Sequence, residues 1–225
     1  MKQKKPSYFY VVYLSIILVI VILFMLFLVN LNENETENQI ERVDNYSLDL
    51  IKERVEKDTK VVDSTTSRFN AEERAMFAEK GLQYFEPDIS YRVVAEFVTD
   101  TSAPVFQMPT TTDRKPNYRI YGYLHFIVHD TLCKLTAYQN MDFKNSPAYD
   151  NTLFVPFMDN TNGLHTYGGG RYLDIDIPVI DTCILDFNRA YNPYCAYAEH
   201  YSCPLPPREN WVGVRIAAGE MDFAE

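Results

Sequence analysis

Three segments in the second half of the chain gather the side chains that could do chemistry. They are Asp159–Tyr172 (DNTNGLHTYGGGRY), Leu185–Tyr197 (LDFNRAYNPYCAY) and Cys203–Asn210 (CPLPPREN). In the first segment, three successive glycines precede Arg171 and allow the backbone to approach a neighbouring group closely. Backbone amides there could bind an anion, with the Arg171 guanidinium as a bidentate partner for carboxylate or phosphate. The same pattern is also typical of a sharp turn between strands in which Arg171 pairs with an internal carboxylate.

The second segment is dense in hydrogen-bonding side chains. Asn192 and Pro193 favour a turn, and Asp186 and Asn188 lie on one face of the preceding strand. Side chains grouped in this way could orient a small polar ligand, or they could form a buried polar network that closes an irregular loop over the core. We predict a ligand-binding cluster of Arg119, Arg171, Asp186, Asn188, Tyr191, Asn192 and Tyr197.

Two cysteines, Cys195 and Cys203, lie on either side of His200. Paired cysteines that border a loop predict a disulfide in an oxidising compartment, and we rank this hypothesis ahead of free buried thiols. Zinc ranks third, because zinc motifs usually have more closely spaced pairs and a fourth ligand, such as His165, would come from far away. We therefore predict neither a metal nor another cofactor.

Signals for catalysis are weaker than those for binding. The sequence has no Gly-x-Ser-x-Gly nucleophile elbow. His125 and His129 would be about 13 Å apart along one strand, too far to share a metal. Asp174 and Asp176 share a strand face and could serve acid–base chemistry, although such alternation usually marks a solvated face. Binding is therefore the first hypothesis, and an envelope enzyme, a hydrolase with or without a metal, is the alternative.

The three segments, taken in order, resemble DUF1684, an uncharacterised family of bacterial and archaeal proteins. Shorter upstream pieces are similar too, namely Gly81–Phe85 (GLQYF), Arg119–Leu124 (RIYGYL) and Leu153–Phe157 (LFVPF). The resemblance covers roughly Leu48 to Phe223. It implies no known activity, so no catalytic residue can be transferred from it.

Short alternating segments must position these residues. Tyr118–His129 (YRIYGYLHFIVH) alternates between apolar and polar faces, and Leu132–Tyr138 is its expected hairpin partner. Further strands are expected at Tyr91–Val98, Leu153–Phe157, Tyr172–Ile177, Cys183–Phe187 and Val212–Ile216. We predict a mainly β fold, an antiparallel sandwich or barrel, with one or two short helices at its N-terminal side. One helix covers 49–62, and the other begins with an Asn70/Glu73 capping box and ends at Gly81.

An apolar run from Tyr8 to Leu31 carries no charge until Glu33. A hydrocarbon core of about 30 Å requires about 20 helical residues, so the run predicts a transmembrane helix. Lysines precede the run and glutamates follow it, which predicts a cytoplasmic N-terminus. A cleaved signal peptide is the alternative, but its apolar region would span only about 7–15 residues and end in small residues.

The chain therefore divides into a cytoplasmic tail (1–7), a transmembrane helix (8–31), a polar spacer (32–47) and an extracytoplasmic mostly-β domain (48–225). The expected location is the membrane, with a single pass and the C-terminal domain outside the cytoplasm. Expected partners are the lipid bilayer through residues 8–31 and an unknown small polar ligand or envelope protein. The formal net charge of −10, without a basic patch downstream of the anchor, argues against nucleic acid.

Overall fold

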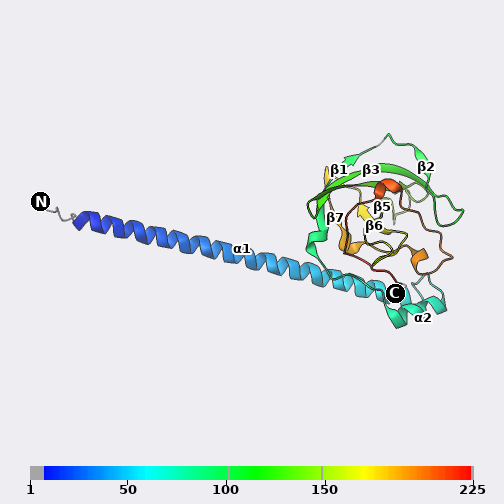
Figure 1. The fold of residues 1–225 in the computed structure, drawn as a ribbon, viewed down its shortest axis with the longest axis horizontal. Coiled ribbons are helices and arrows are strands. Elements are labelled where there is room, and N and C mark those ends of the chain that lie inside the picture. The colour runs from blue at the N-terminus through cyan, green and yellow to red at the C-terminus, as the bar shows by residue number, and fades with distance from the viewer. Residues whose placement is uncertain (1–7, 101, 148, 224–225) are drawn as a thin grey trace. The chain divides into compact units, whose positions relative to one another are not determined.

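The computed structural model describes residues 8–100, 102–147 and 149–223 (Figure 1). The chain divides into two units, one ending at Leu48 and the other beginning at Asp49. The predicted cytoplasmic tail, residues 1–7, lies outside the described residues.

Helix α1 spans Tyr8–Val62, so it contributes to both units. It includes residues 32–47, for which the sequence predicts a polar spacer. Among the described residues, no helix is both long enough and apolar enough to cross a membrane. The transmembrane helix over residues 8–31 therefore stays a prediction.

The second unit contains one seven-stranded antiparallel sheet that curls into a half-barrel (Figure 1). Its strands are β1 (Arg92–Thr99), β2 (Val105–Gln107), β3 (Asn117–Val128), β4 (Thr131–Asn140), β5 (Thr152–Phe157), β6 (Arg171–Asp176) and β7 (Thr182–Asp186). The order is β6-β5-β4-β3-β1-β7, and β2 pairs with β3. The prediction of a mainly antiparallel β fold is confirmed, with the sheet taking the form of a half-barrel.

The long hairpin of β3 and β4 forms the middle of the sheet. His129 and Asp130 make its turn with φ values of 46° and 60°, the left-handed pair that matches the twist of the two strands. Alternate β3 residues, including Leu124 and Phe126, are buried in the core. Gly122 is required within β3, because an added Cβ would lie 2.7 Å from the carbonyl oxygen of Val98 on β1.

Helical segments cover the N-terminal side of the second unit, as expected. The end of α1 supplies the helix predicted over 49–62, and α2 spans Ala71–Lys80. Asn70 and Glu73 form the predicted capping box, and Gly81 ends the helix with a φ of 66°. The described residues also contain the 3-10 helices η1 (Ile89–Tyr91), η2 (Phe187–Arg189), η3 (Tyr194–Ala196) and η4 (Arg208–Asn210).

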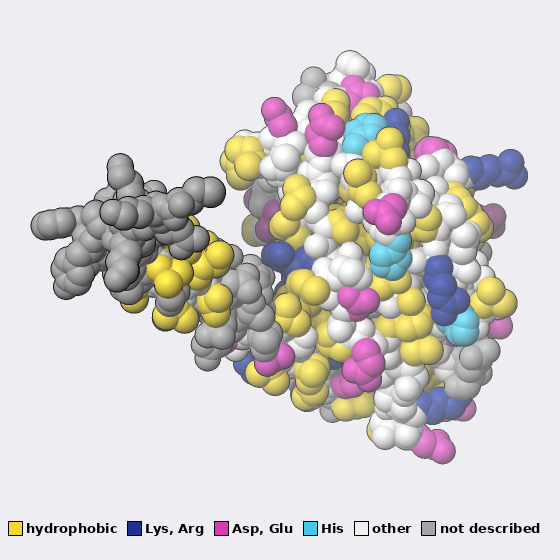
Figure 2. All heavy atoms as spheres, turned by 60° about the vertical axis from the view of Figure 1, so that its left-hand side comes forward, with side chains coloured by type: hydrophobic (Ala, Val, Ile, Leu, Met, Phe, Trp, Pro, Cys, Tyr) yellow, Lys and Arg dark blue, Asp and Glu magenta, His cyan; other side chains and the backbone are white. Residues whose placement is uncertain are grey.

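The outer face of the sheet carries exposed apolar side chains between polar ones. Across β1–β7 and β3–β4 the cross-strand pairs are Val94 with Ile184 and Ile127 with Leu132, each side chain at least 41% exposed. The adjacent pairs, Glu96 with His125 and His125 with Lys134, are polar. Figure 2 shows, on one face of the molecule, hydrophobic side chains interspersed with charged and other polar ones. Apolar side chains interspersed with polar ones are normal on a protein surface and need no partner to explain them.

The predicted strand at Val212–Ile216 is wrong. These residues run irregularly along the core, and Val212 is joined to Met158 by a backbone hydrogen bond of 2.9 Å. Beyond them, Arg171 donates to the carbonyl oxygens of Ile216, Ala218 and Glu220. A side chain thus replaces the neighbouring strand that would otherwise pair with this segment.

Arg171 itself is completely buried and forms an ion pair with Asp159 at 2.9 Å. Burial lowers the pKa of the guanidinium, and the Asp159 carboxylate opposes that shift. The second Asp159 oxygen accepts hydrogen bonds from Thr161 and from the Ile216 amide. Of the two alternatives that the sequence leaves open for Arg171, pairing with an internal carboxylate is the one observed.

Arg171→Met is expected to lower the free energy of unfolding by about 3–5 kcal/mol, because it leaves the Asp159 carboxylate buried without its counter-charge. The control is Lys52→Met, which removes an exposed ion pair with Asp49 and should cost less than about 1 kcal/mol. Urea denaturation of both variants measures the difference. Equal midpoints for the two variants would contradict the structural role of Arg171.

Candidate functional site

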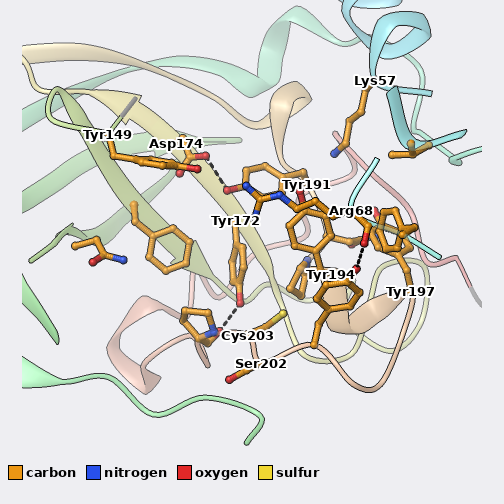
Figure 3. A pocket seen from close by; sticks show the side chains of 18 of the residues that line it. Lys57, Arg68, Tyr149, Tyr172, Asp174, Tyr191, Tyr194, Tyr197, Ser202 and Cys203 are labelled. Atoms are coloured by element: carbon orange, nitrogen blue, oxygen red, sulfur yellow. Dashed lines mark hydrogen bonds between the residues drawn. The ribbon is translucent and has the colours of Figure 1, made fainter. Parts of the chain in front are cut away.

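A cavity of about 810 Å³ opens between the end of α1, strands β3 to β6 and the segment 191–204 (Figure 3). This volume lies within the range of small-molecule sites. Its wall contains ten aromatic residues, namely Phe69, Tyr118, Phe143, Tyr149, Phe154, Tyr172, Tyr191, Tyr194, Tyr197 and Tyr201. We call it the tyrosine cavity. A second cavity of about 540 Å³ is lined largely by apolar residues and prolines, among them Leu205.

The inner wall of the tyrosine cavity is fixed by Tyr172 and Tyr191. Their backbones exchange two hydrogen bonds of 2.9 and 3.0 Å, and their rings meet edge to face at 5.7 Å. The Tyr172 hydroxyl donates to the carbonyl oxygen of Pro204. Burial raises the pKa of both phenols, so both are neutral at physiological pH. They therefore act as rigid hydrogen-bonding surfaces.

Asp174 is the only carboxylate among the described residues that line this cavity. It accepts a 2.7 Å hydrogen bond from the Tyr191 hydroxyl. The side chain is exposed to the cavity, yet the protein atoms around the cavity desolvate it. This desolvation raises the pKa of Asp174, and the bond from Tyr191 partly opposes the change. The site thus contains one carboxyl group that protonates more readily than an ordinary aspartate.

Four basic side chains also line the cavity. Lys57 forms an ion pair with Glu220 and lies over the Tyr191 ring at 5.1 Å. The Arg68 guanidinium lies 5.8 Å from the centre of the Tyr194 ring. Lys60 and Arg114 complete the set. Figure 3 places Tyr149 and Asp174 at one side of the opening and Tyr194 and Tyr197 at the other.

The structure brings only part of the predicted cluster to the cavity. Tyr191, Asn192 and Tyr197 line it, as does Cys203. Glu220 holds two of these residues from behind, because its carboxylate accepts from the backbone N–H of Asn192 at 2.7 Å and from the Tyr197 hydroxyl at 2.5 Å. The Arg171 guanidinium also contacts Glu220, because it donates to the Glu220 backbone carbonyl oxygen at 3.1 Å.

The remaining predicted residues lie elsewhere. Asp186 accepts from the Asn188 backbone and side chain, and Asn188 in turn exchanges hydrogen bonds of 2.9 and 2.7 Å with the Asp88 backbone. This network fastens η2 to the segment before β1. Arg119 donates to Gln139 across β3 and β4 at 3.0 Å. Arg119, Arg171, Asp186 and Asn188 are absent from the described lining of the cavity.

Sequence reasoning missed several residues of this wall. Lys57, Arg68 and Arg114 lie outside the three motif segments, and Tyr149 lies in a loop with no chemical signature. The only available signal was the unusual content of 17 tyrosines. Composition alone cannot show which tyrosines meet.

A profile of the family described as "Protein of unknown function (DUF1684)" matches residues 77–221. The chain belongs to the DUF1684 family. The match contains all seven strands and all three motif segments, so the resemblance inferred from those segments is confirmed. Lys57, Lys60 and Arg68 precede the matched residues.

An uncharacterised protein from Haloarcula marismortui, with a solution structure determined by NMR, is similar in sequence and fold to this DUF1684 protein. The two are 35% identical with a TM-score of 0.62, and the match covers 82% of this chain and 98% of the archaeal one. Among curated proteins, none matches this chain.

The zinc hypothesis for the DUF1684 domain finds little geometric support. His200 is largely exposed, contacts Glu73 at 3.5 Å and stacks on Tyr201. Among the described residues, no group of three or more His, Cys, Asp or Glu side chains is arranged to hold a metal ion.

Cys195 and Cys203 carry free thiols in the structure but lie close together. The Cys195 amide donates to the Cys203 sulfur at 3.2 Å, and the Tyr167 hydroxyl lies 3.8 Å from the Cys195 sulfur. The hydrogen bond from the Cys203 thiol lowers the pKa of Cys195, while the pKa of Cys203 is raised. A lowered pKa favours the thiolate of Cys195, the form that attacks during disulfide exchange.

We expect oxidised glutathione to join Cys195 and Cys203 in a disulfide. Alkylation after denaturation, followed by mass spectrometry, should then label Cys133 and Cys183 only. Cys195→Ser is the control, since it should leave Cys203 open to alkylation. Two alkylated thiols at positions 195 and 203 of the oxidised native protein would refute the pairing.

Proposed function

We propose that this protein is a membrane-anchored module whose extracytoplasmic DUF1684 domain binds a small polar ligand in the tyrosine cavity. The observation that carries the proposal is the convergence of ten aromatic and several charged side chains on one cavity of about 810 Å³. Such a combination of apolar rings and a few polar groups is typical of ligand sites. An envelope protein as the partner is less well supported, because the exposed apolar pairs on the sheet are bordered by polar ones.

The aromatic wall offers two kinds of contact. Tyr149 and Tyr194 are 47% and 41% exposed, so part of each ring is accessible to an apolar or ring-shaped part of a ligand. Tyr172 and Tyr191 are committed to fixed partners and shape the inner wall. Rigid walls reduce the ordering that binding requires, which favours affinity.

An envelope hydrolase is the second candidate, and one observation favours it. Asp174 faces the cavity with a raised pKa, a property that suits a general acid. Most glycoside hydrolases need a second carboxylate, however, and Asp174 is the only one among the described lining residues. Binding is therefore our first proposal.

Membrane anchoring rests on the sequence and on the N-terminal unit taken by itself. The apolar run at 8–31 is helical, and its described large apolar side chains between Leu18 and Val29 are 45–61% exposed. An isolated helix that exposes such side chains is unfavourable in water, whereas a bilayer would cover them. The lysines before the run favour a cytoplasmic N-terminus.

Binding is tested by thermal unfolding of the full chain in detergent against a panel of neutral and charged sugars, nucleosides, nucleotides, amino acids and dicarboxylates. At least one compound is expected to raise the melting temperature, since a ligand that binds the folded state stabilises it. Tyr149→Ala and Tyr194→Ala should each weaken its binding by about 1 kcal/mol through loss of a ring face.

The matched control for these variants is Leu205→Ala, which truncates an exposed side chain at the second cavity. It should leave binding unchanged. If no compound in the panel stabilises the protein, or if both tyrosine variants bind as tightly as the wild type, the proposed function fails.

Topology is tested separately with intact spheroplasts. Added protease is expected to digest the chain after Asn32, because the proposed orientation exposes everything beyond the anchor. A C-terminal epitope followed by immunoblotting reports the cleavage, and permeabilised cells give the value for full access. Complete protection of the epitope in intact spheroplasts would exclude this orientation.

A further inference from the structure

The charge of the tyrosine cavity is opposite to that of the whole protein. The chain has a formal net charge of −10, yet four basic side chains and a single carboxylate are found among the described residues that line the cavity. Asp174, that carboxylate, is bound by the Tyr191 hydroxyl. A cleft lined by one sign of charge attracts ligands of the other sign.

The four basic groups differ in how far they are already neutralised. Lys57 is paired with Glu220, and Lys60 lies 3.7 Å from Glu56 in an exposed pair. Within the part of the chain that the structure describes, neither Arg68 nor Arg114 forms an ion pair with a carboxylate. The two arginines are therefore the basic side chains of the cavity whose charge no described carboxylate neutralises.

Arg68 and Arg114 are both held against the same short segment of the wall. The Arg68 guanidinium lies on the Tyr194 ring, and the Tyr201 hydroxyl donates to the Arg68 carbonyl oxygen at 2.7 Å. Arg114 donates to the side chain and the carbonyl oxygen of Ser202 at 3.1 and 2.8 Å. Arg68 thus contacts one ring of the pair Tyr194 and Tyr201, whose centroids are 5.3 Å apart, and Arg114 contacts Ser202, the residue that follows Tyr201.

Guanidinium groups bind phosphate, sulfate and carboxylate with paired hydrogen bonds, and they do so better than lysine because their donors form a fixed fork. A ring that stacks on Tyr194 would bring its substituents near these forks. At the other side of the opening, Asp174 can accept a hydrogen bond from a ligand hydroxyl. The guanidinium groups, the Tyr194 ring and the Asp174 carboxylate could thus each recognise a different part of one ligand: its anionic group, its ring and a hydroxyl.

We infer that the ligand of the tyrosine cavity is a hydroxylated ring compound with an anionic group, such as an acidic, phosphorylated or sulfated sugar, or a nucleotide. Arg68 and Arg114 bind the anionic group, Tyr149 and Tyr194 contact the ring, and Asp174 binds a hydroxyl. This inference rests on the proposed function and adds the chemical class of the ligand.

The test compares pairs of probes that differ in one anionic group, by calorimetric titration of the full chain in detergent at low salt. The pairs are glucose 6-phosphate with glucose, glucuronate with glucose, and AMP with adenosine. In at least one pair the anionic member should bind about tenfold more tightly, an advantage that falls as sodium chloride is added. Comparing the pairs also separates sugar phosphates, acidic sugars and nucleotides as the source of the anion.

Substitutions of the two arginines localise the effect. Arg68→Met and Arg114→Met should each remove most of the advantage of the anionic probe while leaving the neutral probe unaffected. Arg68→Lys and Arg114→Lys keep the charge but lose the fork, so they should retain part of it. Arg215→Met, which changes an exposed arginine outside the cavity, is the matched control and should behave as the wild type. The salt dependence of the wild type requires no variant and tests the inference even if one variant fails to fold.

Equal affinity for the charged and neutral members of every pair that binds would overturn the inference and leave the proposed function standing. If neutral compounds from the wider panel bind but none of the three anionic probes does, the inference is likewise overturned and the proposed function stands. If no compound binds at all, the proposed function and the inference fail together.

Discussion

The position of the C-terminal segment depends on one buried charge. Arg171 collects the carbonyl oxygens of residues 216, 218 and 220, which are spaced two apart. The backbone bends between the last two of them, at Gly219 with a φ of 78°, and the donors of one guanidinium reach all three carbonyls. A fully buried guanidinium carries a large desolvation cost, which only an equally buried counter-ion and further acceptors can offset. Asp159 supplies the charge, and the segment supplies the acceptors.

The positions of several residues that line the tyrosine cavity depend on this ion pair. Because Arg171 fixes the backbone at Glu220, the Glu220 side chain is in place to hold Asn192, Tyr197 and Lys57. These three residues line the cavity, whereas Arg171 lies behind them. The residue that the sequence marks most clearly as an anion ligand therefore acts on the site indirectly. Its loss would be felt first as lower stability and only then as a distorted cavity.

Local patterns predicted the β3–β4 hairpin, the Asn70–Glu73 capping box and the mainly β fold, because alternation and capping depend on near neighbours. Local patterns did not predict side-chain positions that depend on contacts between residues far apart in the sequence. Whether Arg171 faces solvent or the core depends on Asp159 and on carbonyl groups 45 to 49 positions away. Arg114 meets Ser202 across 88 positions, so no motif could place it in the site. The half-barrel brings the motifs only partly together, with Asp186 and Asn188 fastening η2 instead of lining the cavity.

The contrast between an acidic protein and a basic cavity follows from the range of electrostatic forces. At physiological ionic strength the Debye length is about 8 Å, so acidic side chains elsewhere on the surface are largely screened from a ligand inside the cavity. The four basic side chains around it are within contact range and decide the local potential. For the anionic ligand that we propose, the negative surface would slow its approach, and the side chains of the cavity would set how long it stays bound. Net charge therefore does not indicate the charge of the ligand, and the side chains that line the site do.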